Sequence, residues 1–487
     1  MPFPGFRALR FAPLLLVVPT LLSCNNDPAG SDTPYVVTPI TSATLAGTAG
    51  WTLADTLVVE VRDAEGHPVP GARVLWSLPD GGRLEVQSAE ADNRMVGTAD
   101  DRGRNYAVWT LGLTEGPQEV SAVSGVGGAP ASLTATATVL HAIQVTMSAA
   151  TFCAILPDQR PVCWGDNRYG QLGTGDTVSR SKPTRIAGLA AVQEIRTSAW
   201  HTCARDLSGD VWCWGTNGFG QGGRDATQPF QTSPVRVAGA EGAVSLSLSA
   251  DFYRPFTCAV LSAGGAECWG FNDEGQLGTG DSVTSASPRQ VVGSGGFRSI
   301  YSGGDGRSCA LDAGGEAWCW GDVYHGSPPP LPSALSPTPE RPVPGHKYST
   351  LAVGAFSVCG IQLDGVASCW GVNAGSLGTW VEPGTEVSGP LRADLDEHLA
   401  QISSDGWNGF YARTRFGQGF MWGETNGDVF TILPVLITPS LRVEDLSASN
   451  SMGYCVIAVG GGVYCAPERG WYRQDEALQG VPDLVGP

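Results

Sequence analysis

Lysine is scarce in this sequence and charge of either sign is low, which excludes several classes of protein. The 487 residues include two lysines, Lys182 and Lys347, and neither follows a glycine, so a phosphate-binding loop ending in Gly-Lys is excluded. Charged residues make up 16% of the chain, and the formal net charge is −18. Because a nucleic-acid-binding protein needs a basic surface to neutralise phosphates, we expect no nucleic-acid partner.

Catalytic signatures are also missing. The chain contains neither His-Glu-x-x-His nor Gly-x-Ser-x-Gly, and its six histidines are scattered. A single Gly-x-Gly-x-x-Gly match at residues 218–223 falls inside a repeat rather than between a strand and a helix, so it does not indicate a dinucleotide site. We therefore predict a protein that is not an enzyme and that needs no cofactor.

Glycine and proline, in contrast, are abundant. With 66 Gly and 34 Pro they make up about a fifth of the chain, while hydrophobic residues reach 42%. A turn-rich, charge-poor chain with enough apolar residues for real cores favours an all-β fold, and the length suits two or three domains.

The first residues have the pattern of an export signal. Arg7 and Arg10 precede an apolar run at residues 11–22, which is too short to cross a bilayer. The run ends Leu-Leu-Ser-Cys24, which resembles the bacterial lipobox; a plain secretory signal with an accidental cysteine is the alternative. The resemblance implies that residues 1–23 are a lipoprotein signal peptide and that the Cys24 sulfur is lipidated. Residues 24–34 are then a polar tether, and stable anchoring needs more than one acyl chain.

This signal sets the predicted location. We expect a membrane-anchored lipoprotein of the bacterial cell envelope that faces the periplasm or the exterior. Its membrane contact is then the acyl anchor on Cys24, since no other apolar run approaches 18 residues.

Twelve cysteines remain after Cys24, and they fall into six pairs with ten positions between partners. In an exported chain this regularity predicts six disulfides; zinc is the competing interpretation, but the spacing is not that of zinc ligands. The pairs are Cys153 and Cys163, Cys203 and Cys213, Cys258 and Cys268, Cys309 and Cys319, Cys359 and Cys369, and Cys455 and Cys465.

The pairs mark a repeat of about 50 residues. Compare CAILPDQRPVCWGDNRYGQLGTGD from Cys153 with CAVLSAGGAECWGFNDEGQLGTGD from Cys258. Five weaker copies follow the same pattern, and one of them has Tyr411 and Met421 at the two cysteine positions. Both cysteines are lost together there, as expected if each disulfide is internal to its repeat.

Each copy predicts a disulfide-linked hairpin. Six copies have a glycine six positions after the first residue of the pair, where a three-residue hairpin loop needs a left-handed residue. With Gly209 last in its loop, Ala204 pairs with Trp212 and Cys203 lies opposite Cys213 on adjacent antiparallel strands. The six glycines are Gly209, Gly264, Gly315, Gly365, Gly417 and Gly461.

A tryptophan after the second cysteine recurs in six copies. It points to the opposite strand face from the cysteine, and its recurrence favours packing between repeats over ligand binding. The glycine after it is expected to let neighbouring backbones approach. Apolar residues upstream supply a first strand and a proline-led segment downstream supplies a fourth, so seven copies predict a seven-bladed β-propeller. The tryptophans are Trp164, Trp214, Trp269, Trp320, Trp370 and Trp422.

The Gly-Gln-Leu-Gly-x-Gly and Cys-Trp-Gly-x-Asn elements resemble the repeat of the regulator of chromosome condensation family over residues 141–487. The resemblance implies a seven-bladed propeller. The eukaryotic founder is a guanine nucleotide exchange factor, but no exchange residue maps onto this exported, acidic chain. Secreted bacterial members, including a β-lactamase inhibitory propeller, imply a fold used for protein binding.

Residues 35–139 contain no cysteine and are predicted to be a separate β-sandwich. Short alternating runs recur, such as Leu57/Val59/Val61 and Ala107/Trp109/Leu111, with turns between them. Their order resembles bacterial Ig-like domains of the invasin and intimin type. Such domains usually act as stalks.

These features together predict an Ig-like stalk and a propeller head that binds an unidentified extracytoplasmic protein or glycan. The alternative is a nucleotide-exchange or enzyme-inhibitor activity inherited from the propeller family. One insertion interrupts the fourth repeat: residues 327–344 are rich in proline, and we expect them to form an extended, stiff loop.

Overall fold

The computed structural model describes residues 35–480 except 43, 50–51, 80–81, 91–92, 113–114, 126–127, 250, 252, 323–334, 374, 383–384, 426–428, 439–440, 450–452 and 467–478. Cys24, the predicted signal peptide and the tether up to residue 34 lie outside the described residues. Among the residues described, none belongs to a helix long and apolar enough to cross a bilayer.

The N-terminal part is a domain of two sheets that enclose one apolar core. One sheet has the order β1-β3-β8-β5 and the other β2-β10-β9-β4-β7-β6, with β2 and β10 parallel. The strands are β1 (Val36–Pro39), β2 (Thr44–Thr48), β3 (Leu57–Arg62), β4 (Arg73–Ser77), β5 (Arg83–Val86), β6 (Ala89–Glu90), β7 (Asn93–Thr98), β8 (Arg104–Thr110), β9 (Gly116–Ser124) and β10 (Ala131–Thr138).

The alternation predicted from the sequence sets the core of this two-sheet domain. Leu57, Val59 and Val61 of β3 are buried, as are Trp76 and Trp109 from opposite sheets. The Trp76 indole donates to Asn105 Oδ1 at 2.8 Å, so its polar group is satisfied in the core.

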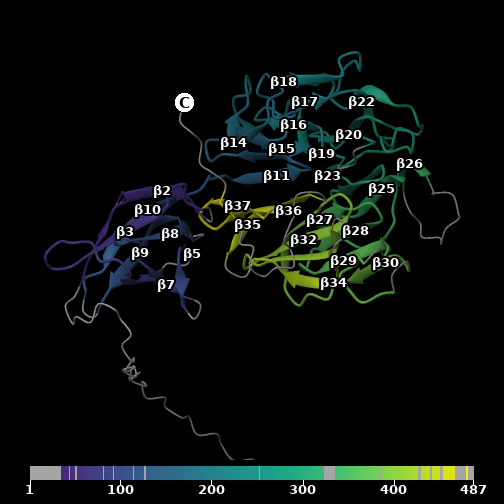
Figure 1. Cartoon of the computed structure of the whole chain (residues 1–487). Coiled ribbons are helices and arrows are strands. Elements are labelled where there is room, and N and C mark those ends of the chain that lie inside the picture. The colour runs from purple at the N-terminus through teal and green to yellow at the C-terminus, as the bar shows by residue number, and fades with distance from the viewer. Residues whose placement is uncertain are drawn as a thin grey trace, which may run out of the picture.

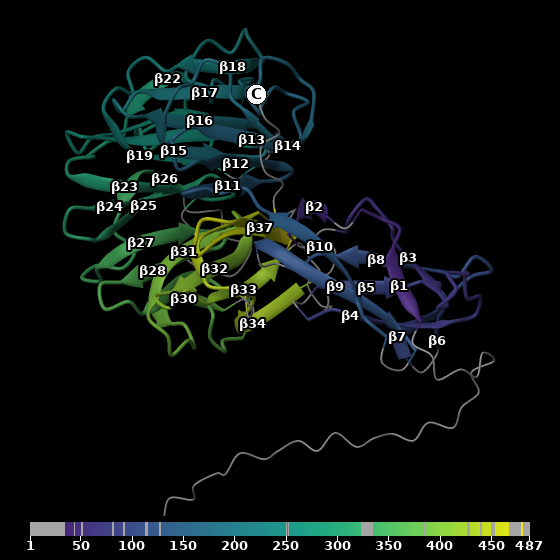
Figure 2. The same cartoon turned by 90° about the vertical axis from the view of Figure 1, so that its left-hand side faces the viewer.

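Seven four-stranded antiparallel sheets follow among the described residues and form the ring seen in Figures 1 and 2. Each blade is one run of four consecutive strands, here called inner, second, third and outer. The blades are β11 (Gln144–Ser148), β12 (Thr151–Ile155), β13 (Pro161–Gly165) and β14 (Arg180–Arg185); β15 (Val192–Thr197), β16 (His201–Asp206), β17 (Val211–Thr216) and β18 (Phe230–Arg236); β19 (Ala243–Leu248), β20 (Phe256–Leu261), β21 (Ala266–Gly270) and β22 (Ser285–Gln290); β23 (Phe297–Ser302), β24 (Arg307–Asp312), β25 (Ala317–Asp322) and β26 (Leu335–Glu340); β27 (Tyr348–Val353), β28 (Ser357–Gln362), β29 (Ala367–Val372) and β30 (Glu386–Arg392); β31 (Leu399–Ser404), β32 (Asn408–Thr414), β33 (Gly419–Thr425) and β34 (Val429–Leu436); and β35 (Val443–Ser449), β36 (Gly453–Ala458), β37 (Val463–Ala466) and β38 (Gln479–Gly480).

The hairpin register predicted from the sequence is confirmed. Ala204 pairs with Trp212 and Cys203 lies opposite Cys213, and the same register recurs in the other blades. The structure joins each of the twelve cysteines to the one ten positions away, with Cα atoms 4.0–4.1 Å apart. Six disulfides therefore cross-link the second and third strands of six blades.

The predicted left-handed glycines occupy the hairpin loops, with φ between 82° and 92°. In the first blade Gln159 takes this position with φ 66°. A left-handed conformation costs a residue with a Cβ roughly 1–2 kcal/mol, so Gln159 is a local strain that the other blades avoid.

Replacing Gln159 is expected to relieve this strain. The Gln159→Gly variant keeps both backbone hydrogen bonds of residue 159, to Leu156 O and from Val192 N. After the entropy cost of glycine in the unfolded chain, we expect a gain of about 0.5–1 kcal/mol in urea denaturation. Arg160→Gly is the control, since Arg160 has no positive φ and gains nothing. Equal destabilisation by both changes would contradict this account.

The repeated tryptophans pack between blades, as predicted. Trp214, Trp269 and Trp320 are fully buried, and each indole donates to a backbone carbonyl of the preceding blade at 2.8–2.9 Å. The glycine that follows allows the predicted approach of the neighbouring backbone, since a Cβ at Gly215 would lie 3.3 Å from Gln171 Cα of the preceding blade. It also has a role that was not predicted. A Cβ at Gly215 would collide first with Trp200 O in its own blade, at a bulge between third and outer strands where φ is 88°.

The ring closes without exchanging a strand, since the first and last blades are each built from consecutive strands. Side chains of β35 join the two blades: Asp445 Oδ2 accepts from Val145 N at 3.0 Å and Ser447 Oγ from Met147 N at 3.1 Å. Burial raises the pKa of Asp445, so this contact lies in a desolvated position.

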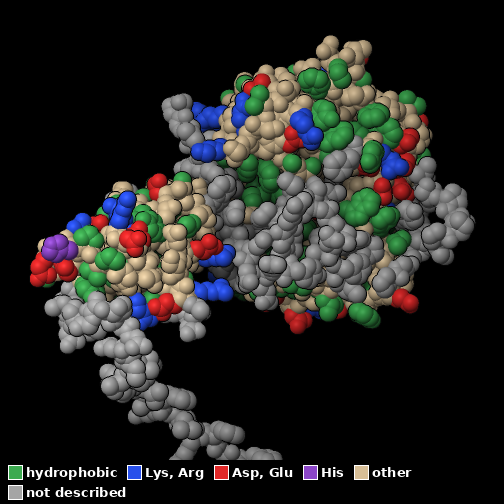
Figure 3. All heavy atoms as spheres, in the orientation of Figure 1, with side chains coloured by type: hydrophobic (Ala, Val, Ile, Leu, Met, Phe, Trp, Pro, Cys, Tyr) green, Lys and Arg blue, Asp and Glu red, His purple; other side chains and the backbone are tan. Residues whose placement is uncertain are grey.

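The two-sheet domain lies beside the last blade in both views (Figures 1 and 2). His141 Nε2 lies 2.9 Å from Glu115 Oε2, and His141 also forms an isolated bridge with Gly462. Acidic and basic side chains are interspersed over the visible face of this domain (Figure 3).

The predicted stiff loop at residues 327–344 is only partly borne out. Residues 323–334 lie outside the described part, but Leu335–Glu340 form β26, the regular outer strand of the fourth blade. Pro337 and Pro339 are compatible with a strand there because an outer strand needs its backbone donors on one side only. Outer strands of five other blades also contain proline, at Pro183, Pro234, Pro288, Pro390 and Pro434.

Candidate binding face

Each blade has two connections at the same end, because its strands alternate in direction. The turn between inner and second strands and the loop between third and outer strands meet there, and we call this side of the ring the loop face. The hairpins between second and third strands lie on the opposite side, which we call the hairpin face.

A buried asparagine shapes the loop between third and outer strands. Asn167 Oδ1 accepts from Leu172 N at 2.9 Å, while its Nδ2 donates to Val178 O and Asp176 O. Gln171 Oε1 accepts from Tyr169 N at 2.9 Å. These bonds explain why Asn-x-x-Gly-Gln recurs, since the two amides replace backbone partners that the loop lacks.

The same turn presents a different side chain in each of the first three blades. Gln221 Oε1 accepts a hydrogen bond from Phe219 N, and Gln276 Oε1 accepts one from Glu274 N, each at 2.9 Å. Gln171 Oε1 accepts from Tyr169 N in the same way. The residue before the glycine therefore varies while the framework stays fixed. This one position changes the chemistry of the loop face from blade to blade.

Tyr169 and Phe219 help to line a groove of about 400 Å³ between the first three blades. Trp200 stacks on Tyr169 with ring centroids 5.2 Å apart, and Phe219 meets Phe271 edge to face at 4.9 Å. Trp200, Phe219 and Phe230 are exposed in the groove, so aromatic surface is available to a ligand.

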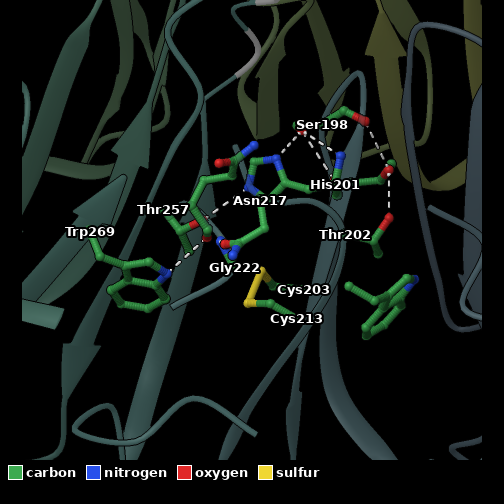
Figure 4. The surroundings of a disulfide bond; sticks show 12 residues. Ser198, His201, Thr202, Cys203, Cys213, Asn217, Gly222, Thr257 and Trp269 are labelled. Carbon is green, nitrogen blue, oxygen red and sulfur yellow. Dashed lines mark hydrogen bonds between the residues drawn. A yellow bond between two sulfur atoms is a disulfide. The ribbon is translucent and has the colours of Figure 1, made fainter. Parts of the chain in front are cut away.

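His201 is fully buried and lines the floor of this aromatic groove. Figure 4 shows His201 with its hydrogen-bonded neighbours Ser198 and Thr257. Ser198 Oγ lies 2.6 Å from Nδ1, and Thr257 Oγ1 from the next blade lies 3.0 Å from Nε2. Burial lowers the pKa of His201 to about 3, so the imidazole is neutral near pH 7. Both ring nitrogens are engaged by hydroxyl groups, which makes His201 a positioning residue that ties two blades together.

Carboxylates gather beside the groove around Arg254. Its guanidinium lies 3.6 Å from Asp251, 2.9 Å from Glu274 and 3.1 Å from Asp305. Asp251 also lines the groove. Burial raises the pKa of Glu274 to about 7, although Arg254 acts in the other direction. This acidic cluster thus holds three carboxylates around one arginine, although Glu274 is partly protonated near pH 7.

The central channel and possible metal sites are weaker candidates for ligand binding. The central channel of about 810 Å³ is lined mainly by the inner strands. Ser245 and Ser247 accept from Ile300 N and Ser302 N, whereas the hydroxyls of Ser299 and Ser302 have no hydrogen-bond partner in the structure. Within the described part of the chain, no group of three or more His, Cys, Asp or Glu side chains is arranged to hold a metal.

The residues singled out from the sequence are not those of this face. The twelve paired cysteines lie in the hairpins, and Cys24 lies outside the described residues. Trp200, Phe219 and Asp251 were missed because they stand at variable positions. A signal was present, since the residue before Gly-Gln reads Tyr, Phe and Glu in copies that are otherwise alike.

The ring is a β-propeller, and two stretches of it match a known repeat. Residues 163–205 and 268–311 match the family model described as the regulator of chromosome condensation (RCC1) repeat, and residues 192–221 match a second model of that repeat.

Similar proteins share parts of this chain. The ultraviolet-B receptor UVR8 of Arabidopsis thaliana is 27% identical over 291 residues, which cover 57% of this chain and 64% of the receptor. The probable E3 ubiquitin-protein ligase HERC6 of Homo sapiens is 32% identical over 195 residues, or 39% of this chain and 18% of the ligase. The chain thus spans less than two thirds of these relatives.

Solved structures show the same fold. A crystal structure of human WBSCR16 superposes with a TM-score of 0.55 at 18% identity, covering 78% of this chain and 97% of that one. Yeast RCC1 (Prp20), solved bound to Kap60, gives 0.53 at 18% identity, covering 71% and 87%. At these identities the likeness concerns the fold alone.

Proposed function

We propose that this protein is a lipid-anchored binding protein of the bacterial cell envelope whose propeller head captures a partner on its loop face. The observation that carries the proposal is the aromatic groove, where Trp200, Phe219 and Phe230 remain exposed on a framework otherwise held by buried amides. Exposed aromatic side chains grouped in a concave site are typical of binding surfaces. UVR8 is described as a receptor and yeast RCC1 was solved with a bound protein, which supports a binding role.

The two-sheet domain is proposed to be an Ig-like stalk. The cysteine-free sequence order that resembles invasin-type domains supports this, as does its place between the predicted tether and the propeller. Its packing beside the last blade would hold the head in one orientation.

The anchor is tested by Cys24→Ser. The sulfur is the predicted acyl acceptor, so the variant is expected to move from the membrane fraction to the soluble fraction, as measured by ultracentrifugation and immunoblotting. Cys153→Ser with Cys163→Ser is the control, because it removes sulfur without touching the tether. Wild-type membrane partitioning of Cys24→Ser would rule out the lipoprotein assignment.

The binding role is tested by capture from envelope and culture fractions with the full chain. Trp200→Ala combined with Phe219→Ala should lose the captured partner. Phe416→Ala removes a more exposed aromatic ring from the hairpin face and should retain the partner. Retention by both variants would place the binding surface elsewhere.

A nucleotide-exchange or inhibitor activity is the second candidate, carried only by the resemblance to the family. GDP release from a panel of GTPases would detect exchange. No residue of the loop face described above favours it over binding.

A further inference from the structure

We infer that the aromatic groove binds an arginine side chain of a basic protein partner, with the guanidinium stacked on the aromatic rings and directed to the acidic cluster. This inference rests on the proposed function and names the chemistry of the partner. It selects a basic protein over a neutral glycan or a second copy of this chain.

The aromatic walls suit a planar cation. Trp200, which stacks on Tyr169, is 37% exposed at the groove, and Phe219 and Phe230 add two more rings. A guanidinium over such faces gains cation–π attraction, and the arginine stem covers apolar surface.

Charge determines the orientation of that cation. Asp251 belongs both to the groove and to the acidic cluster, where Arg254 lies within 3.6 Å of Asp251, Glu274 and Asp305. Glu274 Oε2 is buried, so a ligand in the groove does not reach this oxygen. Asp251, which lines the groove, is the carboxylate that meets the guanidinium.

A second buried acid lies behind this cluster. Asp322 is 7% exposed, and its Oδ1 has no hydrogen-bond partner in the structure. Arg307 Nε donates to the backbone oxygen of Asp322 at 2.8 Å. Four carboxylates thus accompany two guanidinium groups in the acidic cluster and behind it, and Asp251 is the member of this set that lines the groove.

The positive charge of Arg168, which also lines the groove, does not oppose the binding of a guanidinium. Arg168 lies at the opposite end, where its Nη2 is 2.9 Å from Asp166 Oδ2, so the two charges compensate each other. A second copy of the chain, with a net charge of −18, would bring like charge to the acidic cluster. A neutral sugar would leave the excess carboxylates unpaired.

The test uses the full chain labelled with 5-fluorotryptophan, so that ¹⁹F NMR reports each exposed indole separately. The probes are acetyl-arginine amide, its neutral isostere acetyl-citrulline amide, and maltotriose. The Trp200 resonance, assigned by its loss in Trp200→Phe, should shift with the arginine probe and at least tenfold more weakly with citrulline. The resonance of Trp380, which is 75% exposed on another blade, should not move.

Two matched variants remove one carboxylate each. Asp251→Asn keeps the bond that Asp251 Oδ1 accepts from Tyr253 N and should weaken arginine binding about tenfold. Asp364→Asn changes the net charge equally on the hairpin face, keeps the bond from Val366 N, and should leave binding unchanged.

Equal response to arginine and citrulline, a Trp200 shift with maltotriose alone, or an equal effect of the two Asp variants would overturn the inference. With any of these outcomes, the proposed binding role of the loop face still holds if the double variant Trp200→Ala, Phe219→Ala loses its captured partner. If the double variant retains the partner, the proposal that the loop face is the binding surface is wrong.

Discussion

Reducing the six disulfides is expected to unfold the propeller under conditions where the oxidised protein stays folded. Each bond closes a hairpin of about eleven residues, which the chain-entropy model values at roughly 2–3 kcal/mol. Even discounted for hairpins that persist in the unfolded chain, six such terms are comparable with the roughly 5–15 kcal/mol by which a domain is stable.

The measurement is thermal unfolding, followed by tryptophan fluorescence, with and without a phosphine reductant. Cys203 and Cys213 are fully buried, as are most of their counterparts, so native protein should be reduced only as fast as blades open. The two-sheet domain contains no cysteine and provides an internal control: its amide protons should stay protected in the reductant. A reduced protein that melts within a few degrees of the oxidised one would contradict the expectation.

Trp269→Ala is expected to destabilise the oxidised head by about 3–5 kcal/mol, the usual range for emptying a buried tryptophan site. The indole is fully buried between the second and third blades and donates to Gln221 O at 2.9 Å. Thr257 Oγ1 donates to the same carbonyl, so the loss comes mainly from the cavity.

Urea denaturation with intact disulfides measures this effect. Trp380→Ala is the matched control, because this exposed indole should contribute less than about 0.5 kcal/mol. If Trp269→Ala cost under about 1 kcal/mol, the role of the repeated tryptophan in joining blades would be wrong.

The blades were predictable because their structure is local. The ten-residue spacing, the loop glycine and the antiparallel register act within one hairpin, and counting outward from Gly209 gives the pairing of Cys203 with Cys213. Trp269 was predictable for another reason: a side chain that recurs in nearly every copy serves a contact that every copy makes.

The sixth blade shows where local reasoning ends. Its sequence indicates a missing cross-link, and the structure pairs Tyr411 directly with Met421. Tyr411 is nevertheless fully buried, with its ring centroid 6.3 Å from that of Tyr454 in the next blade. Interblade packing occupies the site of the absent disulfide, and the sequence of one hairpin does not contain that information.

The aromatic groove could not be predicted for the same reason. Tyr169, Trp200 and Asp251 come from three repeats, and only closure of the ring brings their loops together. Each of these residues stands at a position that differs from one repeat to the next. A search for recurring residues finds only the positions that stay the same, so it passes over them.

The prolines of the outer strands have a consequence for how the ring meets other chains in crowded surroundings. An outermost strand exposes unpaired backbone groups, which can template pairing with another chain and so seed aggregates. Pro183 and Pro288 each remove one donor from that edge and fix the local backbone, as do their counterparts in the other blades. The perimeter of the ring is thereby made a poor partner for edge-to-edge association, so contacts with other proteins are directed to side chains on its two faces.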